Sequence, residues 1–254
     1  MILSIITPCY NPPTKWEEVY LKQVALIEEK FVDYDIEFIV VNDGSSRDFA
    51  STFTPVMNDP RIKLVSYTQN QGKGYAIREG VKAAEGKYII YTDYDFPFGL
   101  KPIFKIFDLL QNGIDVVIGT RTNDYFFKLP LFRKIISFTL KMVNYLWLPS
   151  KLTDTQAGIK GFKSTLKHSF LGINTNSFVF EIEFLRKAVY VEKANCDSIS
   201  VTPNEDIEFS NFSWKQIWKE IKSLFRILIL PKPKVKIAKE ETKISLDNKA
   251  LIRL

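Results

Sequence analysis

YIIYTDYD, residues 88–95, sets the architecture that this chain is expected to have. Its first half is an apolar run with the length and composition of a buried β-strand. Two carboxylates one residue apart, Asp93 and Asp95, follow almost directly. A buried strand that ends in two acids places them at a sheet edge. There, water has to solvate their charge or a cation has to neutralise it. This arrangement fits a site for a metal ion bound to a diphosphate.

Short apolar runs alternate with helical segments through the first half of the 254-residue chain. Apolar residues recur at helical spacing in residues 15–31, 75–84 and 100–110. Strands are predicted at residues 2–6, 36–41, 62–66, 88–92 and 115–119, with a later one near 198–202. The alternation predicts an α/β protein in which helices flank a mainly parallel central sheet.

Composition and charge limit the functions that the chain can have. With 46% apolar residues, the protein can bury one full core. Its formal charge of +6 favours an anionic partner: a nucleotide, a lipid phosphate, a membrane surface or a nucleic acid. No motif of a nucleic-acid-binding protein supports the last of these, so we expect no nucleic-acid partner.

The cysteines and the N-terminal residues bear on the cellular compartment. Cys9 and Cys196 lie far apart and give neither a disulfide framework nor a metal-ligand spacing, which indicates a reducing compartment. Residues 2–6 read as a strand directly after Met1, without a basic region or a cleavage site, so we expect no secretion. An uninterrupted apolar stretch of about 18 residues is also missing, which predicts no membrane span.

Basic and aromatic residues become frequent after about residue 119. Residues 131–148 would read as a membrane span but for Arg133, Lys134 and Lys141, so we expect this segment along a surface or under a lipid.

The C-terminal part divides into two further segments after a domain at residues 1–210. A basic amphipathic helix is predicted within 211–230; it fits a membrane interface, and packing on the domain explains its apolar stripe equally well. Residues 231–254 form a lysine-rich tail without a core pattern.

The turns after the strands lack the common glycine-rich phosphate cradles. The first turn carries no G-x-G-x-x-G and the chain no G-x-x-x-x-G-K-[ST], so a metal and side chains would have to neutralise a bound diphosphate. Three strands instead end near Tyr10, Asp43 and Asp93. Ligands bind beyond the carboxyl ends of such strands, where Asp43 can accept hydrogen bonds from a base or ribose. A helix N-cap or a turn explains Asp43 as well.

Four motifs together resemble those of family 2 glycosyltransferases with the GT-A fold. They are P-x-Y-N at 8–11, V-N-D-G-S-S at 41–46, N-Q-G-K-G-x-A at 70–76 and D-x-D at 93–95. The order and spacing match the family over residues 1 to about 200.

Further motifs are similar to those of the dolichyl- and polyprenyl-phosphate glycosyltransferases, above all the dolichyl-phosphate glucosyltransferase-like group. They are G-T-R at 119–121, R-K-x-x-S at 133–137, D-T-Q-x-G-x-K-x-F at 154–162 and F-E-x-E-F-L at 180–185.

The resemblance implies a sugar nucleotide bound at the strand ends. Asp93 and Asp95 would hold Mg²⁺ or Mn²⁺ on the diphosphate, with Asp95 the closer ligand, so that charge on the leaving nucleotide is stabilised. The donor half is about residues 1–120, and the acceptor half about 121–210. The implied donor-binding residues are Pro8, Tyr10, Asp43, Lys73, Asp93, Tyr94 and Asp95.

The same resemblance implies that Arg121, Arg133 and Ser137 grip the phosphate of a lipid acceptor, because the planar guanidinium group matches phosphate oxygens. With Asp95, the two arginines are the expected catalytic residues. Asp154, Gln156 and Glu181 are expected to support the site; Asp154 and Gln156 could also simply organise a turn.

The acceptor decides whether a general base is needed. A phosphate monoester, with a second pKa near 6, is largely ionised at neutral pH, so it requires none. The reaction would then be a single in-line displacement that inverts the anomeric centre. Glu181 and Glu183 are the reserve bases if the acceptor is a hydroxyl.

Two departures from the family pattern lie on the donor side. Pro12 stands where a glutamate usually follows Tyr-Asn, which removes a carboxylate and reshapes the loop. The apolar residues 96–98 follow Asp95, where relatives often place a polar residue near Pro97 that can join the metal shell.

These observations predict an inverting, metal-dependent hexosyltransferase that joins a UDP- or GDP-sugar to a polyprenyl phosphate, dolichyl or undecaprenyl. We expect it to be cytoplasmic and peripheral to the inner face of the membrane, with a separate membrane-spanning partner as a further expectation. Two alternatives stay open: a family 2 glycosyltransferase acting on a glycan hydroxyl, and a non-catalytic nucleotide-sugar-binding adaptor.

Overall fold

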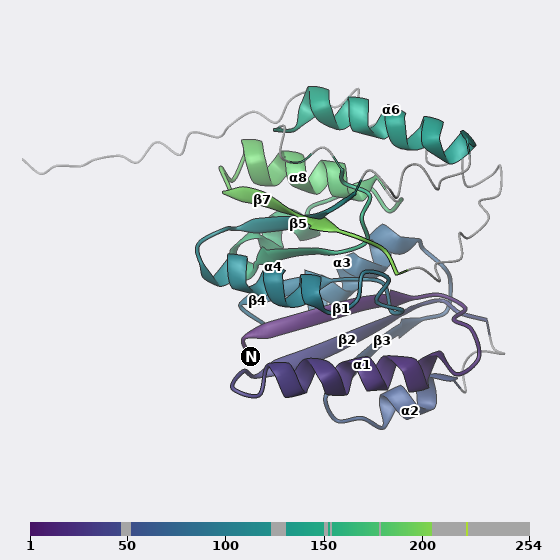
Figure 1. Ribbon diagram of the computed structural model, residues 1–254. Helices are drawn as coiled ribbons and strands as arrows, with labels where there is room; N and C mark the ends of the chain where they lie inside the picture. The colour runs from purple at the N-terminus through teal and green to yellow at the C-terminus, as the bar shows by residue number, and fades with distance from the viewer. Residues whose placement is uncertain are drawn as a thin grey trace, which may run out of the picture.

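The computed structural model describes residues 1–46, 52–122, 131–149, 152, 154–177, 179–204 and 222. The helix predicted within 211–230 and the tail at 231–254 lie outside this part of the chain, apart from residue 222. The described residues form one central sheet with helices on both faces (Figure 1). Its strands are β1 (Leu3–Cys9), β2 (Ile36–Asp43), β3 (Ile62–Tyr67), β4 (Tyr88–Tyr91), β5 (Val116–Arg121), β6 (Lys160–Lys163) and β7 (Cys196–Val201).

The strand order is β3-β2-β1-β4-β6-β5-β7, and the sheet is mainly parallel, as predicted. β1 pairs in parallel with β2 and β4, so that Leu3 lies between Ile36 and Tyr88. The exception is β6, which runs antiparallel to both β4 and β5. This strand was not predicted, because its four residues include two lysines and a glycine and so lack the pattern of a buried strand.

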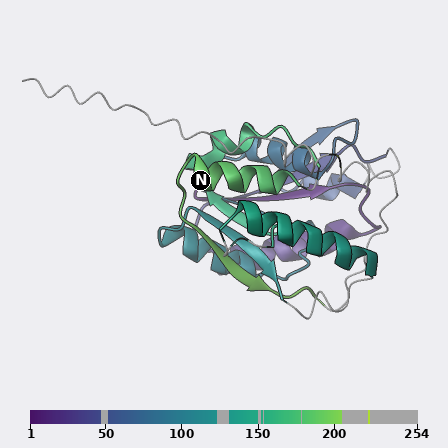
Figure 2. The same cartoon turned by 90° about the horizontal axis from the view of Figure 1, so that it is seen from above.

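Helices cover the two faces in separate sets. One face carries α1 (Trp16–Lys30), α2 (Thr54–Met57) and α4 (Lys101–Gln111). The other carries α3 (Lys73–Ala83), α7 (Lys167–Leu171), which continues a short 3₁₀ turn at Ser164–Leu166, and α8 (Phe180–Tyr190). Figure 2, seen from above, shows helices on either side of the sheet. The helices predicted at 15–31, 75–84 and 100–110 are therefore confirmed, whereas α8 was not predicted.

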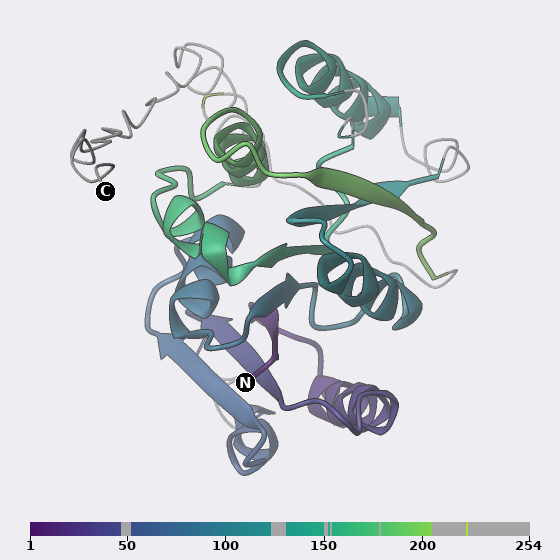
Figure 3. The same ribbon diagram turned by 90° about the vertical axis from the view of Figure 1, so that its left-hand side faces the viewer.

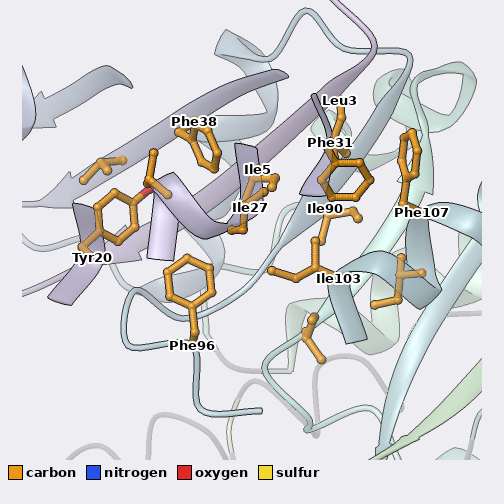
Figure 4. Close-up of a cluster of buried hydrophobic side chains, with 14 of the residues drawn as sticks. Leu3, Ile5, Tyr20, Ile27, Phe31, Phe38, Ile90, Phe96, Ile103 and Phe107 are labelled. Atoms are coloured by element: carbon orange, nitrogen blue, oxygen red, sulfur yellow. The ribbon is translucent and has the colours of Figure 1, made fainter. Parts of the chain in front are cut away.

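Alternating side chains of the buried strands supply the two halves of the core. Figure 4 shows the first half, in which Tyr20 and Ile27 of α1 and Phe31, which follows that helix, cluster with Ile5 of β1 and Phe38 of β2. On the opposite face, the next residues of the same strands, among them Ile6 and Ile39, pack against α3 and α8. Burial on both faces explains why these strands read as continuous apolar runs.

Helix α6 (Leu131–Trp147) matches the segment 131–148 that was expected to lie along a surface. Leu140 of α6 packs against Val179 and Ile182 at the start of α8. The Arg186 guanidinium group of α8 lies 4.2 Å from the ring centroid of Trp147. Figure 3 shows α6 and α8 side by side over the end of the sheet that β7 forms.

Phe162 of β6 anchors the second half of the core. It is fully buried, and its ring lies 5.0 Å from that of Phe170 and 5.1 Å from that of Phe184. We expect Phe162→Ala to lower the free energy of unfolding by about 3–5 kcal/mol, because the cavity adds to the lost transfer free energy. Urea denaturation would measure this. Val32→Ala, at an 80% exposed side chain, is the control; equal effects of the two substitutions would contradict the assigned core.

Candidate active site at the carboxyl ends of the strands

The parallel strands β1, β2 and β4 bring their carboxyl ends to one edge of the sheet. Cys9 is in register with Asn42, and Ile6 with Tyr91. Tyr10, Asp43 and Asp93 therefore share this edge, as the sequence predicted. In an open α/β sheet this is the edge where ligands bind.

Asp93 forms an ion pair with Lys73, the first residue of α3. The Lys73 side chain is 20% exposed. Burial disfavours its ammonium group, but the carboxylates of Asp93, Glu181 and Asp95 more than offset this effect and raise the pKa of Lys73. Lys73 thus stays charged and supplies one positive charge beside the two acids that follow β4.

Asp95 carries the second negative charge of this edge. Its side chain is exposed, yet the surrounding protein excludes enough water from the carboxyl group to raise its pKa, and the like charge of Asp93 raises it further. The pair of acids therefore favours a further cation next to Asp95. Among the residues that the structure describes, no group of three or more acidic, histidine or cysteine side chains could enclose a metal.

Asp43 is buried and organises the loop in front of α3. Its carboxylate accepts hydrogen bonds from the Tyr67 hydroxyl group (2.8 Å) and the Asn70 amide group (2.9 Å). It also accepts them from the backbone N–H groups of Gln71 (2.8 Å) and Gly72 (3.0 Å). Both oxygens thus hold the loop that leads to Lys73. A contact of Asp43 with a base or ribose stays a prediction.

The other expected donor residues line the neighbouring loops. Tyr10 is 51% exposed beyond β1, while Pro8 lies within that strand. The backbone N–H group of Asn11 donates to the Ser45 hydroxyl group at 2.9 Å, which joins the loops after β1 and β2. Tyr94 packs edge-on against Trp16, with ring centroids 5.6 Å apart. The loops after β1 and β2 are thus joined to each other, and Tyr94, between the two acids, is held against the first residue of α1.

The apolar residues after Asp95 anchor their loop in the core. Phe96 is buried and stacks on Tyr20, with ring centroids 5.8 Å apart. Its φ angle of 46° is unusual for a residue other than glycine, and the packing holds it there. The Pro97 carbonyl group accepts a hydrogen bond from the Asn204 N–H group at 2.8 Å. The departure from the family pattern at 96–98 therefore fixes the backbone next to Asp95.

Arg121, at the end of β5, is held by Asp154. Its Nε and Nη2 atoms donate to the two carboxylate oxygens at 2.9 and 2.8 Å, and its backbone N–H group donates at 2.8 Å. Burial alone would favour the neutral acid, but the Arg121 guanidinium group keeps the pKa of Asp154 below its usual value. Asp154 therefore fixes the direction of the guanidinium group that was expected to bind a phosphate.

Helix α6 carries the two other residues that were expected to bind the acceptor phosphate, Arg133 and Ser137. Positions 133, 137 and 141 are spaced four apart and lie along one side of a helix. Ser137 is half-buried, and the Arg133 side chain lies outside the described residues. Burial lowers the pKa of Lys141; the Asp154 carboxylate raises it, and the Arg121 guanidinium group lowers it. Lys141 was not predicted as a site residue, although it lies four residues after Ser137 on the same helix.

A buried ion pair lies behind the site. Lys160 of β6 is 1% exposed, and its ammonium group lies 2.7 Å from Glu181 of α8. The Tyr91 hydroxyl group donates to the same Glu181 oxygen at 3.1 Å. Burial lowers the pKa of Lys160 and raises that of Glu181. Glu181 was expected to support the site, whereas Lys160 was not predicted as a site residue.

The two remaining predicted residues have structural partners. Glu183 accepts hydrogen bonds from the backbone N–H groups of Asn174 and Thr175, both at 3.2 Å, and from the Thr175 hydroxyl group at 2.7 Å. Gln156 is half-buried, and its side-chain amide donates to the Thr155 hydroxyl group at 3.3 Å. The expected supporting role of Gln156 and the reserve role of Glu183 stay predictions.

The fold is the GT-A fold of nucleotide-sugar transferases. A solved structure of glucosyl-3-phosphoglycerate synthase from Mycobacterium tuberculosis, in complex with Mn²⁺, UDP and phosphoglyceric acid, superposes with a TM-score of 0.59 at 17% identity. The superposition covers 91% of this chain and 79% of that one.

The chain belongs to glycosyl transferase family 2, whose model matches residues 4–169. Over 217 residues it is 25% identical to a dolichyl-phosphate β-glucosyltransferase of Dictyostelium discoideum, covering 80% of this chain and 65% of the relative. Over 194 residues it is 28% identical to a dolichol-phosphate mannosyltransferase of Pyrococcus furiosus, covering 75% and 54%. The chain thus matches about half to two thirds of the length of these relatives. No helix in its described residues is long and apolar enough to cross a membrane.

The Arg121–Asp154 pair gives a test of the site geometry. The two side chains are 10% and 2% exposed. Asp154→Asn would turn an amide N–H toward the guanidinium group and leave a buried charge without its partner, so we expect a loss of about 3–5 kcal/mol in unfolding free energy. Glu85→Gln, in the exposed pair with Lys63, is the control and should change stability little. An unchanged urea midpoint for Asp154→Asn would refute the buried pair.

Proposed function

We propose that this protein is an inverting, metal-dependent glycosyltransferase that transfers a hexose from a UDP- or GDP-sugar to a polyprenyl phosphate. The observation that carries the proposal is that one turn, residues 154–158, borders both halves of the site. Asp154 holds Arg121 at one end of the turn, and Gly158 abuts the Asp93 carboxylate at the other. A cation site for a diphosphate would therefore lie at one end of this five-residue turn, and an arginine site for a second phosphate at the other.

On the donor side, Asp95 and Asp93 would hold Mg²⁺ or Mn²⁺. Two carboxylates with an excess of negative charge are the hard oxygen ligands that such ions prefer, and donor diphosphate oxygens and water would complete the shell. When bound, the ion stabilises the charge that develops on the leaving nucleoside diphosphate. Lys73, held by Asp93, lies where its ammonium group can move onto a diphosphate oxygen. Tyr10 and Pro8 border the base and ribose.

On the acceptor side, Arg121 and the α6 row at 133, 137 and 141 would bind the lipid phosphate. Asp154 fixes the orientation of the Arg121 guanidinium group, so this side chain loses little conformational entropy when a phosphate binds. Lys141, on the same side of α6 as positions 133 and 137, would add a further positive charge. An already ionised phosphate monoester needs no proton acceptor, and the residues have only to align it for in-line attack.

The environments of the reserve bases also favour a phosphate acceptor. The Glu181 carboxylate is paired with Lys160 and hydrogen-bonded to Tyr91, and Glu183 caps the 174–175 backbone. A base for a glycan hydroxyl would have to leave these partners. This argues against the alternative in which the acceptor is a hydroxyl.

The exposed side of α6 supports a position on a membrane surface. Phe138, Met142 and Tyr145 are 65%, 55% and 70% exposed and recur at helical spacing. A basic helix with such a stripe suits the lipid interface at the inner face of a membrane. The predicted segment at 211–230 would extend this contact, and a separate membrane-spanning partner would suit a catalytic part held there.

Transfer itself is the first test. The protein would be incubated with labelled UDP- and GDP-sugars and polyprenyl phosphate, with and without Mn²⁺, and the product extracted into organic solvent. We expect label in the solvent phase only with metal.

Asp95→Asn should lower the rate about a hundredfold or more, because the metal that stabilises the leaving nucleotide loses a ligand. It should also weaken Mn²⁺ binding measured by electron paramagnetic resonance. Asp108→Asn, at an exposed acid of α4, is the control. Donor binding without turnover, with Asp95→Asn unchanged, would instead indicate an adaptor.

Arg133→Ala tests the acceptor. Loss of a charge-assisted hydrogen bond should raise KM for polyprenyl phosphate about 10- to 100-fold while donor binding is unchanged. Lys134→Ala, at the neighbouring position of α6, is the matched control. Activity that survives Arg133→Ala but disappears with Glu181→Gln would favour a glycan hydroxyl as the acceptor.

A further inference from the structure

The turn at 154–158 contacts each part of the site. Besides the contacts of Asp154 and Gly158, the Thr155 hydroxyl group accepts a hydrogen bond from Asn144 of α6 at 3.0 Å. A Cβ atom at position 158 would overlap the Asp93 carboxylate and lie 3.4 Å from the Lys73 ammonium group. A shift of this turn would therefore move Arg121, α6 and the Asp93–Lys73 pair together.

Lys160 holds the turn from inside the protein. Its ammonium group donates to the Ala157 carbonyl oxygen at 2.6 Å, in the middle of the turn, and lies 2.7 Å from the Glu181 carboxylate. It also lies 5.8 Å from the ring centroid of Tyr91. Tyr91 is the last residue of β4, two positions before Asp93. The same ammonium group is thus bound to the turn and adjacent to the strand that carries the acids.

Stability alone does not account for this buried charge pair. Removing two charges from water costs free energy that their attraction seldom recovers, and apolar replacements of similar volume are often neutral or stabilising. A methionine at position 160 would fill nearly the same space, but it has no N–H group for the Ala157 carbonyl oxygen. The lysine therefore differs from an apolar residue in that its hydrogen bond fixes the position of the Ala157 carbonyl group.

We propose that Lys160 is a positioning residue that fixes the turn 154–158 and thereby aligns the donor-side acids with the acceptor-side Arg121. The Glu181 carboxyl group fixes the direction of the Lys160 side chain, and Tyr91 orients Glu181. The consequence for transfer rests on the function proposed above. The consequence for the turn and for metal binding does not require turnover.

The experiment compares the wild type, Lys160→Met and the double variant Lys160→Met/Glu181→Met. The double variant removes both buried charges and should unfold at a urea concentration near that of the wild type. Hydrogen exchange of residues 154–158 should nevertheless be about tenfold faster, because the turn opens locally. Mn²⁺ affinity with UDP or GDP present should fall about 10-fold or more, and KM for polyprenyl phosphate should rise in parallel.

Lys163→Met is the matched control. Lys163 lies three residues further along β6 and is also paired with a carboxylate, Asp115, at 2.8 Å, but it does not contact the turn. It should leave exchange of residues 154–158 and Mn²⁺ affinity unchanged. Wild-type exchange and Mn²⁺ affinity in a stable double variant would overturn the positioning role. Absence of transfer by the wild type would refute the proposed function instead, and hydrogen exchange would still decide the role of Lys160.

Discussion

The negative charge at the end of β4 is the constraint on which the rest of the site depends. Asp93 and Asp95 follow a strand that is buried on both faces, and two like charges at such a place require a positive partner. Lys73 supplies one positive charge through its ion pair with Asp93. The Asp43 carboxylate in turn fixes the loop in front of α3, which begins at Lys73. The arrangement of two strand ends and one helix start follows from this electrostatic requirement.

The second half of the site is tied to the first through the turn at residues 154–158. Gly158 lies so close to the Asp93 carboxylate that a larger residue would displace it. Four residues earlier, Asp154 determines the orientation of the Arg121 guanidinium group. The antiparallel strand β6 delivers this turn between β4 and β5, which makes it the element that relates donor and acceptor groups. This short antiparallel strand thus sets the relative position of the two proposed phosphate sites.

Much of this could be read from the sequence because it depends on local pattern. Continuous apolar runs indicated β1, β2 and β4, and the polar residues at their ends, Tyr10, Asp43 and Asp93, indicated the edge that they share. β6 and Lys160 could not be found in this way, since a buried lysine is tolerated only because Glu181, from a distant helix, lies next to it. The role of Asp43 was hidden for the same reason: its four donors come from residues 67–72, and their convergence is a tertiary feature.

The most direct test of the account is a crystal of the protein soaked with Mn²⁺ and either UDP or GDP, with the anomalous signal of manganese recorded. We expect a peak between the Asp95 carboxylate and the diphosphate, with the turn 154–158 in place and Lys73 displaced from Asp93 toward the diphosphate. A nucleotide bound at the strand ends with no manganese beside Asp95, or manganese bound elsewhere on the protein, would contradict it.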